Sequence, residues 1–262
     1  MNFIKNKKIF YVNSRDRISG TDSDFIFKVD MPSMQNFNKI CVLSIILPKS
    51  YFNVQNSYNT FILEEKGVQT IITVPAANYN RRSLATGIID LLNTNSPNTW
   101  IYDMTYPNSI VEPDDGKYTF TVTGNDAQPR LIFDDNGMFE LLGFDINSTN
   151  IFDSNSLKSS NVCKIQSEDV IRLHSNISDN NGDDVLLELY SSSTQSFSNI
   201  VFTCQDINVY SRDITSKGTN TYRFFLTNED NQRLDLNGLN ICFSIIVYEE
   251  SKKLLISPSS IL

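Results

Sequence analysis

The residues that most suggest chemistry are carboxylates gathered beside glycine in three short segments, "EPDDG" (112–116), "FDDNG" (133–137) and "SDNNGDD" (178–184). Two carboxylates roughly 5–10 Å apart are sufficient for glycoside hydrolysis. Acidic loops also bind calcium, but none of the three follows the D-x-[DN]-x-[DN]-G ligand spacing. Aspartate and asparagine beside glycine are also typical of tight turns, because their side chains bond to nearby backbone. We interpret the segments as turns; a two-carboxylate hydrolase is the alternative and requires two of them to meet.

Histidine chemistry depends on one residue, since His174 is the only histidine in the chain. A Ser-His-Asp or Cys-His arrangement would have to use it. The segment "VIRLHSN" alternates, which places His174 on the face of Val170 and Arg172 and opposite Ile171. We expect a partly exposed strand histidine, and we predict no catalytic residue.

Metal and cofactor sites are not predicted either. The cysteines are far apart in the sequence and form no C-x-x-C metal or redox motif: Cys41, Cys163, Cys204 and Cys242. Cys41 and Cys242 stand in apolar runs and are expected to be buried. No phosphate-loop or dinucleotide-binding glycine pattern occurs.

Composition limits the class of partner. The 262 residues carry a net charge of −8, whereas a protein that binds nucleic-acid duplexes needs a basic surface. Lys5, Lys7 and Lys8 form a small basic cluster, expected to be a solvated tail, with an interior-facing arm that touches nucleic acid as the alternative. The first residues lack an apolar signal-peptide core, and the apolar run 40–47 is shorter than the ~20 residues of a membrane helix. We expect a soluble protein assembled in a reducing compartment.

Most of the chain is predicted to form short β-strands, because apolar residues alternate or run together between turn residues. The expected strands cover 25–31, 39–47, 60–65, 69–75, 100–106, 117–124, 130–133, 169–175, 184–191, 196–204, 207–212, 221–228 and 240–250. One helix is predicted over 81–93, capped by Asn80, and a short helical turn closed by Gly143 over 136–144. The Ser/Asn-rich stretch up to Asn161 is expected to be a linker. Many short strands favour a sandwich or barrel.

The stretch "TNEDNQRLDLNGLNICFSIIVYEE" (227–250) combines two turns with a strand. "NEDNQ" lacks calcium-ligand spacing and is interpreted as a turn. Asn237-Gly238 is typical of a tight turn in which both residues adopt positive φ. The run 241–248 is apolar on both faces, which predicts a central or covered strand.

Several segments together resemble a known family. They are "YVNSRDRISGTDSDFIFKVD", "NKICVLSIILPKSYFNVQNSYNTFILEE", "VPAANYNRRSLATGIIDLLN", "LLGF" and "LDLNGLNICFSIIVYEE". In this order they resemble the penton, or vertex, capsid proteins of virophages and polinton-like viruses, with relatives among large DNA viruses. The resemblance is strongest in 11–93 and 222–250. This chain has "PAANYN" where many relatives carry glycine before the helix.

The resemblance implies an all-β fold, a single jelly-roll sandwich of two four-stranded antiparallel sheets. We expect residues 1–65 and 155–262 to form it, and 66–154, with the helix, to be an insertion. It also implies a non-enzymatic virion protein without cofactors. Five copies would form a plug at each icosahedral vertex, surrounded by a double jelly-roll major capsid protein. An internal membrane or minor capsid proteins are further expected partners, and assembly is expected in the host cytoplasm or a viral factory.

Alternative functions place the chain elsewhere in the virion. It is then a minor or cement capsid protein, or a host-attachment sandwich that binds glycans. The glycan site would use loop residues, with Trp100, Tyr102, Asp114 and Asp115 as candidates. Candidate subunit-interface residues are loop aromatics, for which core burial is the other reading: Tyr51, Phe52, Tyr58 and Tyr79.

Overall fold

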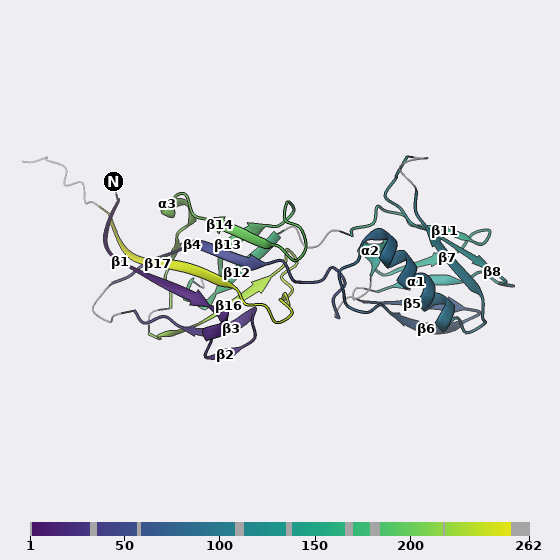
Figure 1. Ribbon diagram of the computed structural model, residues 1–262, viewed down its shortest axis with the longest axis horizontal. Helices are drawn as coiled ribbons and strands as arrows, with labels where there is room; N and C mark the ends of the chain where they lie inside the picture. The colour runs from purple at the N-terminus through teal and green to yellow at the C-terminus, as the bar shows by residue number, and fades with distance from the viewer. Residues whose placement is uncertain are drawn as a thin grey trace, which may run out of the picture. The chain divides into compact units, whose positions relative to one another are not determined.

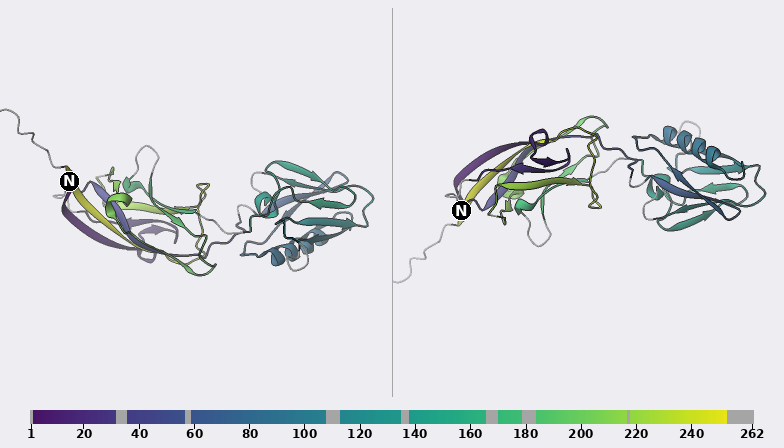
Figure 2. Two further views of the ribbon diagram at one scale, coloured as in Figure 1. Left: turned by 90° about the horizontal axis from the view of Figure 1, so that it is seen from above. Right: turned by 90° about the horizontal axis from the view of Figure 1, so that it is seen from below.

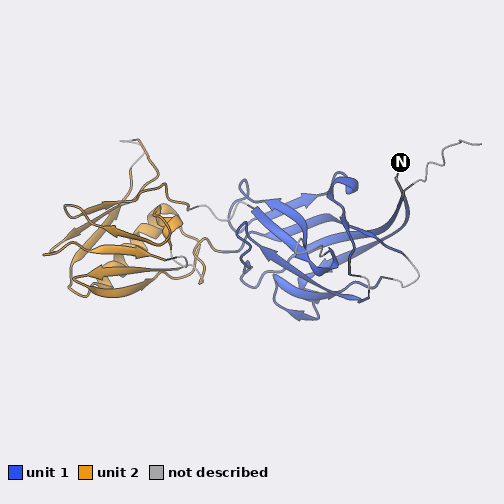
Figure 3. Cartoon of the chain, turned by 180° about the vertical axis from the view of Figure 1, so that it is seen from behind, with its two compact units in different colours: residues 1–51, 168–262 blue, residues 52–167 orange. Residues whose placement is uncertain are grey.

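The computed structural model describes residues 2–31, 36–56, 59–107, 113–134, 138–165, 170–178, 184–216 and 218–252. The chain divides into two compact units (Figure 3). Unit 1 comprises Met1–Tyr51 and Glu168–Leu262, and unit 2 comprises Phe52–Ser167. Unit 2 is therefore an uninterrupted segment between two parts of unit 1. Within the described ranges, no helix has both the length and the apolar character needed to cross a membrane.

Unit 1 consists of two antiparallel sheets (Figures 1 and 2). Sheet A has the order β1-β17-β4-β14, and sheet B has the order β13-β12-β16-β3-β2. A two-residue strand, β15, also pairs with β4. The bounds are β1 Asn2–Asn13, β2 Ser19–Gly20, β3 Asp24–Lys28, β4 Lys39–Pro48, β12 Val170–Ser175, β13 Val185–Tyr190, β14 Asn199–Thr203, β15 Arg212–Asp213, β16 Thr221–Thr227 and β17 Cys242–Lys252.

This arrangement is all-β and jelly-roll-like, as the sequence predicts. Each sheet has four main strands and one two-residue strand, β15 in sheet A and β2 in sheet B. Short helical segments interrupt the strands: η1 Ser14–Asp16, η2 Asn176–Ser178 and α3 Ile207–Tyr210. The prediction of a strand over 207–212 is wrong for α3, where Asp206 accepts a hydrogen bond from the Asn208 amide and caps a helical turn instead.

The core of unit 1 lies between the two sheets. Alternate residues of both sheets point inward and form one apolar cluster. Phe224 of sheet B meets Phe243 of sheet A edge to face, with ring centroids 5.2 Å apart. Phe224 also packs beside Phe25 on the neighbouring strand. The alternation of apolar and polar residues in these strands therefore predicts correctly which residues face the core.

Strand β17 is covered on both faces, as the continuous apolar run predicts. Phe243, Ile245 and Val247 join the core between the sheets. Ile246 and Tyr248 point to the other side and join a second cluster with Cys41. Both edges of β17 are also paired, one with β1 and one with β4.

The interpretation of the first residues as a tail is wrong. They form β1, in which Lys7 pairs with Tyr248 and Lys8 with Val247 of β17. Lys5 and Lys7 are exposed, and Lys8 donates to the Asp30 carbonyl over 2.8 Å. The lysine-rich sequence conceals the strand, because it is the partner strand that supplies the hydrogen bonds and the covered face.

Unit 2 has its own core, built from two sheets and a helix (Figure 1). Its sheets have the orders β10-β9-β5-β6 and β11-β8-β7. The bounds are β5 Thr60–Glu65, β6 Val68–Thr73, α1 Arg81–Asn95, β7 Ile101–Thr105, β8 Thr119–Thr123, β9 Arg130–Phe133, α2 Phe139–Leu142, β10 Ser148–Ile151 and β11 Ser156–Lys158. Helix α1 packs against β6 and β7.

Both predicted helical segments of unit 2 are confirmed. Asn80 and Ser83 form a reciprocal capping box at the start of α1. The buried side of α1 includes Leu84, Ile88 and Leu92. Gly143 ends α2 with φ +76°, and a Cβ there would lie 2.3 Å from the Asn161 carbonyl oxygen. Glycine is therefore required at this position by both conformation and space.

The borders of the units differ from the predicted ones. The predicted border at 65/66 falls in the turn of the β5–β6 hairpin, and the border at 154/155 precedes β11, which pairs with β8 of unit 2. The chain instead passes from unit 1 to unit 2 between residues 51 and 52, and it returns to unit 1 between residues 167 and 168. The expected Ser/Asn-rich linker contains β10 and β11, because this segment pairs with β9 and β8 of unit 2.

The turn at Asn237-Gly238 is confirmed, with φ values of +52° and +84°. The Leu239 amide donates to the Leu236 carbonyl and closes the turn. The Asn237 side chain donates to the Ser50 carbonyl over 2.6 Å and so ties the turn to the segment that follows β4.

We predict that Asn237→Val lowers the free energy of unfolding of unit 1 by about 1–3 kcal/mol, because a β-branched residue is strained at positive φ. Asn237→Gly is the matched control, since it loses the Ser50 bond but keeps the conformation. Urea denaturation followed by circular dichroism measures both. A valine variant as stable as the glycine variant would contradict the strain argument.

Candidate functional site

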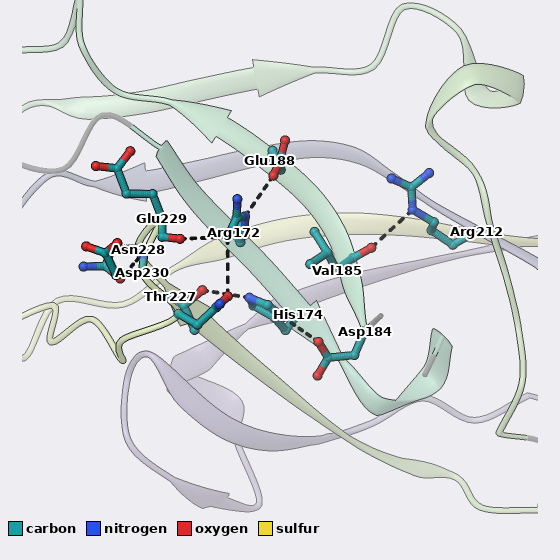
Figure 4. Close-up of polar contacts among 11 residues, drawn as sticks. Arg172, His174, Asp184, Val185, Glu188, Arg212, Thr227, Asn228, Glu229 and Asp230 are labelled. Atoms are coloured by element: carbon teal, nitrogen blue, oxygen red, sulfur yellow. Dashed lines mark hydrogen bonds and ion pairs between the residues drawn. The ribbon is translucent and has the colours of Figure 1, made fainter. Parts of the chain in front are cut away.

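The arrangement closest to a catalytic site surrounds His174 on the outer face of sheet B (Figure 4). His174 lies on β12, Asp184 directly precedes β13, and Thr227 ends β16. The Nδ1 atom is 2.6 Å from Oδ1 of Asp184, and Nε2 is 2.8 Å from Oγ1 of Thr227. Because an ionised carboxylate only accepts, Nδ1–H donates to Asp184, and in the neutral imidazole the threonine hydroxyl donates to Nε2.

His174 is buried, so the expectation of a partly exposed histidine is wrong. Only 5% of the residue is exposed. A β-bulge between Leu173 and His174 shifts the pairing with β13, and the Phe225 ring stacks on the imidazole with centroids 4.6 Å apart. The Arg233 guanidinium lies 3.3 Å from the Phe225 ring centroid. Alternation predicted the correct face, but it could not show that neighbouring strands and a turn cover it.

Charged groups continue this network across sheet B. Arg172 donates to Glu188 over 2.8 Å and to the Glu229 carbonyl over 3.0 Å (Figure 4). Arg223 holds Asp24 through two hydrogen bonds, and this carboxylate raises the pKa of Arg223. The charges therefore connect adjacent strands of the sheet.

The "NEDNQ" segment is confirmed as a turn. Asn228 is 2% exposed, and its side-chain oxygen accepts from the amides of Asp230 and Gln232. Asn231 has a φ of +61°. These bonds give hydrogen-bond partners to two backbone amides of the turn and hold the Asn228 side chain in place.

The hydrogen-bond chain from Asp184 through His174 to Thr227 has the order of a catalytic triad. A nucleophile must reach its substrate, however, and Thr227 is 2% exposed at the sheet. The role that this geometry supports is structural: the buried His174 and Thr227, with the partly exposed Asp184, join β12, β16 and the start of β13 through hydrogen bonds. Sequence reasoning missed Asp184 and Thr227 as partners, since only the register of the strands brings them to His174.

The acidic loop around Asp114 and Asp115 is also engaged in its own turn. The Gly116 amide donates to Asp114 and the Lys117 amide to Asp115. Asp114 is further bound by Arg81, and Asp115 by Lys158 over 2.6 Å. These bonds lower the pKa of both aspartates. In the described ranges no three His, Cys, Asp or Glu side chains converge as a metal site would require. Residues 112, 135–137 and 179–183 of the acidic segments lie outside those ranges.

The proposed glycan-binding aromatics belong to the core of unit 2. Trp100 is 4% exposed and Tyr102 is 1% exposed. The Tyr102 hydroxyl donates to Glu65 over 2.8 Å, and burial raises the pKa of Tyr102. Neither ring can stack on a sugar, so the expectation of a loop site at these two residues is wrong.

Glu65 is the centre of a buried polar network that the sequence did not indicate. Its carboxylate accepts from Tyr102, from Ser96 and from both the amide and the side chain of Asn98. Ser96 in turn accepts from the Trp100 amide. The network fixes the connection between α1 and β7. The sequence did not indicate this role, because a glutamate at the end of an alternating strand is usually exposed.

The proposed interface aromatics are only partly available. Tyr51 is 1% exposed and belongs to the core of unit 1. Phe52 and Tyr79 are half-buried, and Tyr79 donates to the Pro75 carbonyl. Tyr58 lies outside the described residues.

A different surface exposes apolar groups, on the outer face of sheet A. We define the uncharged face as two neighbouring rows that cross β1, β17, β4 and β14. The rows are Tyr11–Ser244–Ser44–Thr203 and Asn13–Cys242–Ile46–Val201. Tyr11 is 81% exposed, Val201 66% and Ile46 48%. The sequences of β4 and β14 carried this signal, because apolar residues such as Ile46 and Val201 also occupy positions opposite the core.

We predict that Thr227→Val destabilises unit 1 by about 1–3 kcal/mol, because it leaves Nε2 of His174 buried without a donor. Thr227→Ser keeps the hydroxyl and is the matched control. Urea denaturation followed by circular dichroism measures both free energies of unfolding. Equal stability of the two variants would show that the His174 network does not hold the sheet.

We predict that Glu65→Gln destabilises unit 2 by about 1–3 kcal/mol, since an amide NH2 would face donors that now meet a carboxylate oxygen. Trp100 is the single tryptophan, so its fluorescence during denaturation follows unit 2. Glu64→Gln, on the neighbouring residue, is the control and is expected to shift the midpoint much less. The reverse order of the two shifts would contradict the assignment.

No family model matches the sequence, and a search of curated proteins found no match. Solved structures with similar folds include the mavirus penton protein, with 13% identity, a TM-score of 0.43 and coverage of 93% of this chain and 100% of that one. A chain of the Sputnik virophage structure has 10% identity and a TM-score of 0.38, and covers 93% and 98%. Because both TM-scores lie below 0.5, neither likeness by itself establishes a function for this chain.

Proposed function

We propose that the protein is a structural virion protein, a penton that forms a homopentameric plug at the five-fold vertices of an icosahedral capsid. The observation that carries the proposal is the strand order of unit 1. Its eight main strands are paired as β1-β17-β4-β14 and β13-β12-β16-β3. Two sheets connected in this way are the pattern of a single jelly roll, a recurrent fold of viral capsids.

The sequence resemblance supports the same proposal from an independent direction. It is strongest over 11–93 and 222–250, which include strands of both sheets as well as the hairpin and helix of unit 2. Unit 2 lies between β4 and β12 in the chain, the region in which the sequence led us to expect an insertion. The resembling segments therefore follow the framework of the fold rather than one loop.

Fold alone leaves other functions open, because jelly rolls also occur in lectins and cupins. A lectin needs exposed aromatic or polar loops, and the two aromatics suggested by the sequence are buried. A cupin-type centre needs several metal ligands, and the described residues bring no three together. The chemistry of the described surface therefore favours a packing role over a small-molecule role.

A ring of five copies needs two different patches on each subunit that meet head to tail. Each copy carries a charge of −8, so contact between copies is favoured where charge is absent. The uncharged face offers one such patch, with Tyr11, Ile46 and Val201 exposed beside hydroxyl groups. We assign this face to the contact with the next copy in the ring.

The remaining partners follow from the vertex position. A double jelly-roll major capsid protein would surround the plug, and an internal membrane or minor capsid proteins would lie beneath it. The protein would be found in the virion after assembly in the host cytoplasm or a viral factory. A minor or cement capsid protein is the nearest alternative, and the mass of the oligomer separates it from a penton.

We predict a mass near five times the 29.8 kDa chain mass when the purified protein is measured by light scattering at increasing concentration. Val201→Glu introduces a like charge into the contact and is expected to weaken association by at least about tenfold, equal to ~1.4 kcal/mol. Val68→Glu, at an exposed valine of unit 2, is the matched control and should leave the mass unchanged.

Two results would count against the proposal. A chain that stays monomeric and is absent from the vertices of purified particles would exclude the penton role. A pentamer that Val201→Glu leaves intact would keep the penton role but remove the uncharged face from the subunit contact.

A further inference from the structure

Two cysteines that are distant in the sequence touch on the outer side of sheet A. Cys41 lies within β4 and Cys204 directly follows β14. Their Sγ atoms are 3.7 Å apart although 163 positions separate the residues. Both are free thiols in this structure. A disulfide has sulfur atoms about 2.05 Å apart, so the two atoms need to approach by only about 1.7 Å.

The backbone holds the two thiols in this position from both sides. Thr203 pairs with Ser44, and the Cys204 amide donates to the Leu43 carbonyl over 2.8 Å. Further along the same segment, Arg212 pairs with Ile40. The chain from 203 to 212 is therefore attached to β4 on both sides of Cys41. The contact between the sulfur atoms follows from these attachments and not from a free loop.

The two thiols differ in their surroundings. Cys41 is 2% exposed, in a cluster with Ile246 and Tyr248. Burial, with a smaller effect of the Cys204 thiol, raises the pKa of Cys41 to about 12. Cys204 is half-buried and thus accessible to a small reagent. A small reagent can therefore reach the Cys204 thiol from solvent, whereas the Cys41 thiol is buried beside it.

We propose that Cys41 and Cys204 are an oxidisable pair that closes into a disulfide within the folded protein. The oxidant is a small disulfide such as glutathione disulfide. The Cys204 thiolate attacks one sulfur of the oxidant, which forms a mixed disulfide and releases one reduced glutathione. Cys41 then attacks the Cys204 sulfur, the second glutathione leaves as a thiol, and each cysteine proton ends on one released glutathione.

The cross-link would change the restraint on the whole chain. The loop that it closes contains all of unit 2, since Phe52–Ser167 lies between the two cysteines. Closing so long a loop removes much conformational freedom from the unfolded chain. The bond would also fasten the segment with α3 to the centre of sheet A. A protein made in a reducing compartment would thus gain stability after transfer to an oxidising one. This inference does not depend on the proposed function.

Packing alone is the other explanation of two touching thiols, because buried cysteine behaves as a small apolar residue. The two explanations differ in what glutathione disulfide does to the folded protein. Packing predicts no bond between the two residues, whereas the proposed pair predicts an intramolecular bond without loss of structure.

The test is incubation of the full reduced chain with graded mixtures of oxidised and reduced glutathione, followed by intact-mass measurement and peptide mapping without reduction. We expect the loss of two hydrogen atoms, a linked peptide containing Cys41 and Cys204, and two thiols that still react with an alkylating reagent. The melting temperature should rise by about 5–10 °C and fall back when a reductant is added.

Variants make the assignment specific. Cys204→Ser, at the half-buried position, should abolish the linked peptide and the temperature shift, while Cys163→Ser and Cys242→Ser should preserve both. Four free thiols after oxidation, a glutathione adduct on Cys204 that never resolves, or a linked peptide with a different cysteine would each overturn the proposal. Because the wild-type chain is compared before and after oxidation, the result does not rely on the folding of a variant.

Discussion

The structure of unit 1 depends on the position of β17. This strand forms hydrogen bonds along both edges, to β1 and to β4, and it is covered by apolar groups on both faces. Sheet A therefore has its first described strand and its last one side by side, with β1 at the edge and β17 inside the sheet. Contacts between residues so far apart in sequence are costly to form, because the intervening chain must be closed first. Once β17 is in place, it joins parts of the chain that are separated by the whole of unit 2.

This constraint explains how the two units can share one chain. Unit 2 begins and ends between β4 and β12, and it has an independent apolar core and the Glu65 network. A segment with its own core can be placed in a surface connection without altering the sheets around it. Sheet B is held by different means, since His174, Asp184 and Thr227 connect its strands through side-chain hydrogen bonds. Apolar packing on its outer face therefore stabilises sheet A, whereas a network of hydrogen bonds stabilises sheet B.

Local patterns in the sequence predicted local structure well. The helix with its Asn80 cap, the turn at Asn237-Gly238 and the covered strand β17 each depend on a few adjacent residues. Predictions that depend on distant partners were less accurate. The lysines of β1 resembled a tail because the pairing with β17 is invisible in a single segment.

The same limit applies to the sites. His174 was expected to be partly exposed, because the covering by Phe225 and Arg233 comes from other parts of the chain. Glu65 and the contact between Cys41 and Cys204 also arise from tertiary structure alone. The uncharged face was the exception that the sequence could have revealed. Its residues lie on the side of their strands that faces away from the core, where apolar groups have no core to join.

The most direct test of the central claim is an electron cryomicroscopy reconstruction of purified virus particles that contain this protein. If the protein is a penton, five copies occupy each five-fold vertex. In each, density for unit 1 should follow the order β1-β17-β4-β14, with its uncharged face against the neighbouring copy. Density for this chain elsewhere in the shell, or vertices occupied by another protein, would contradict it.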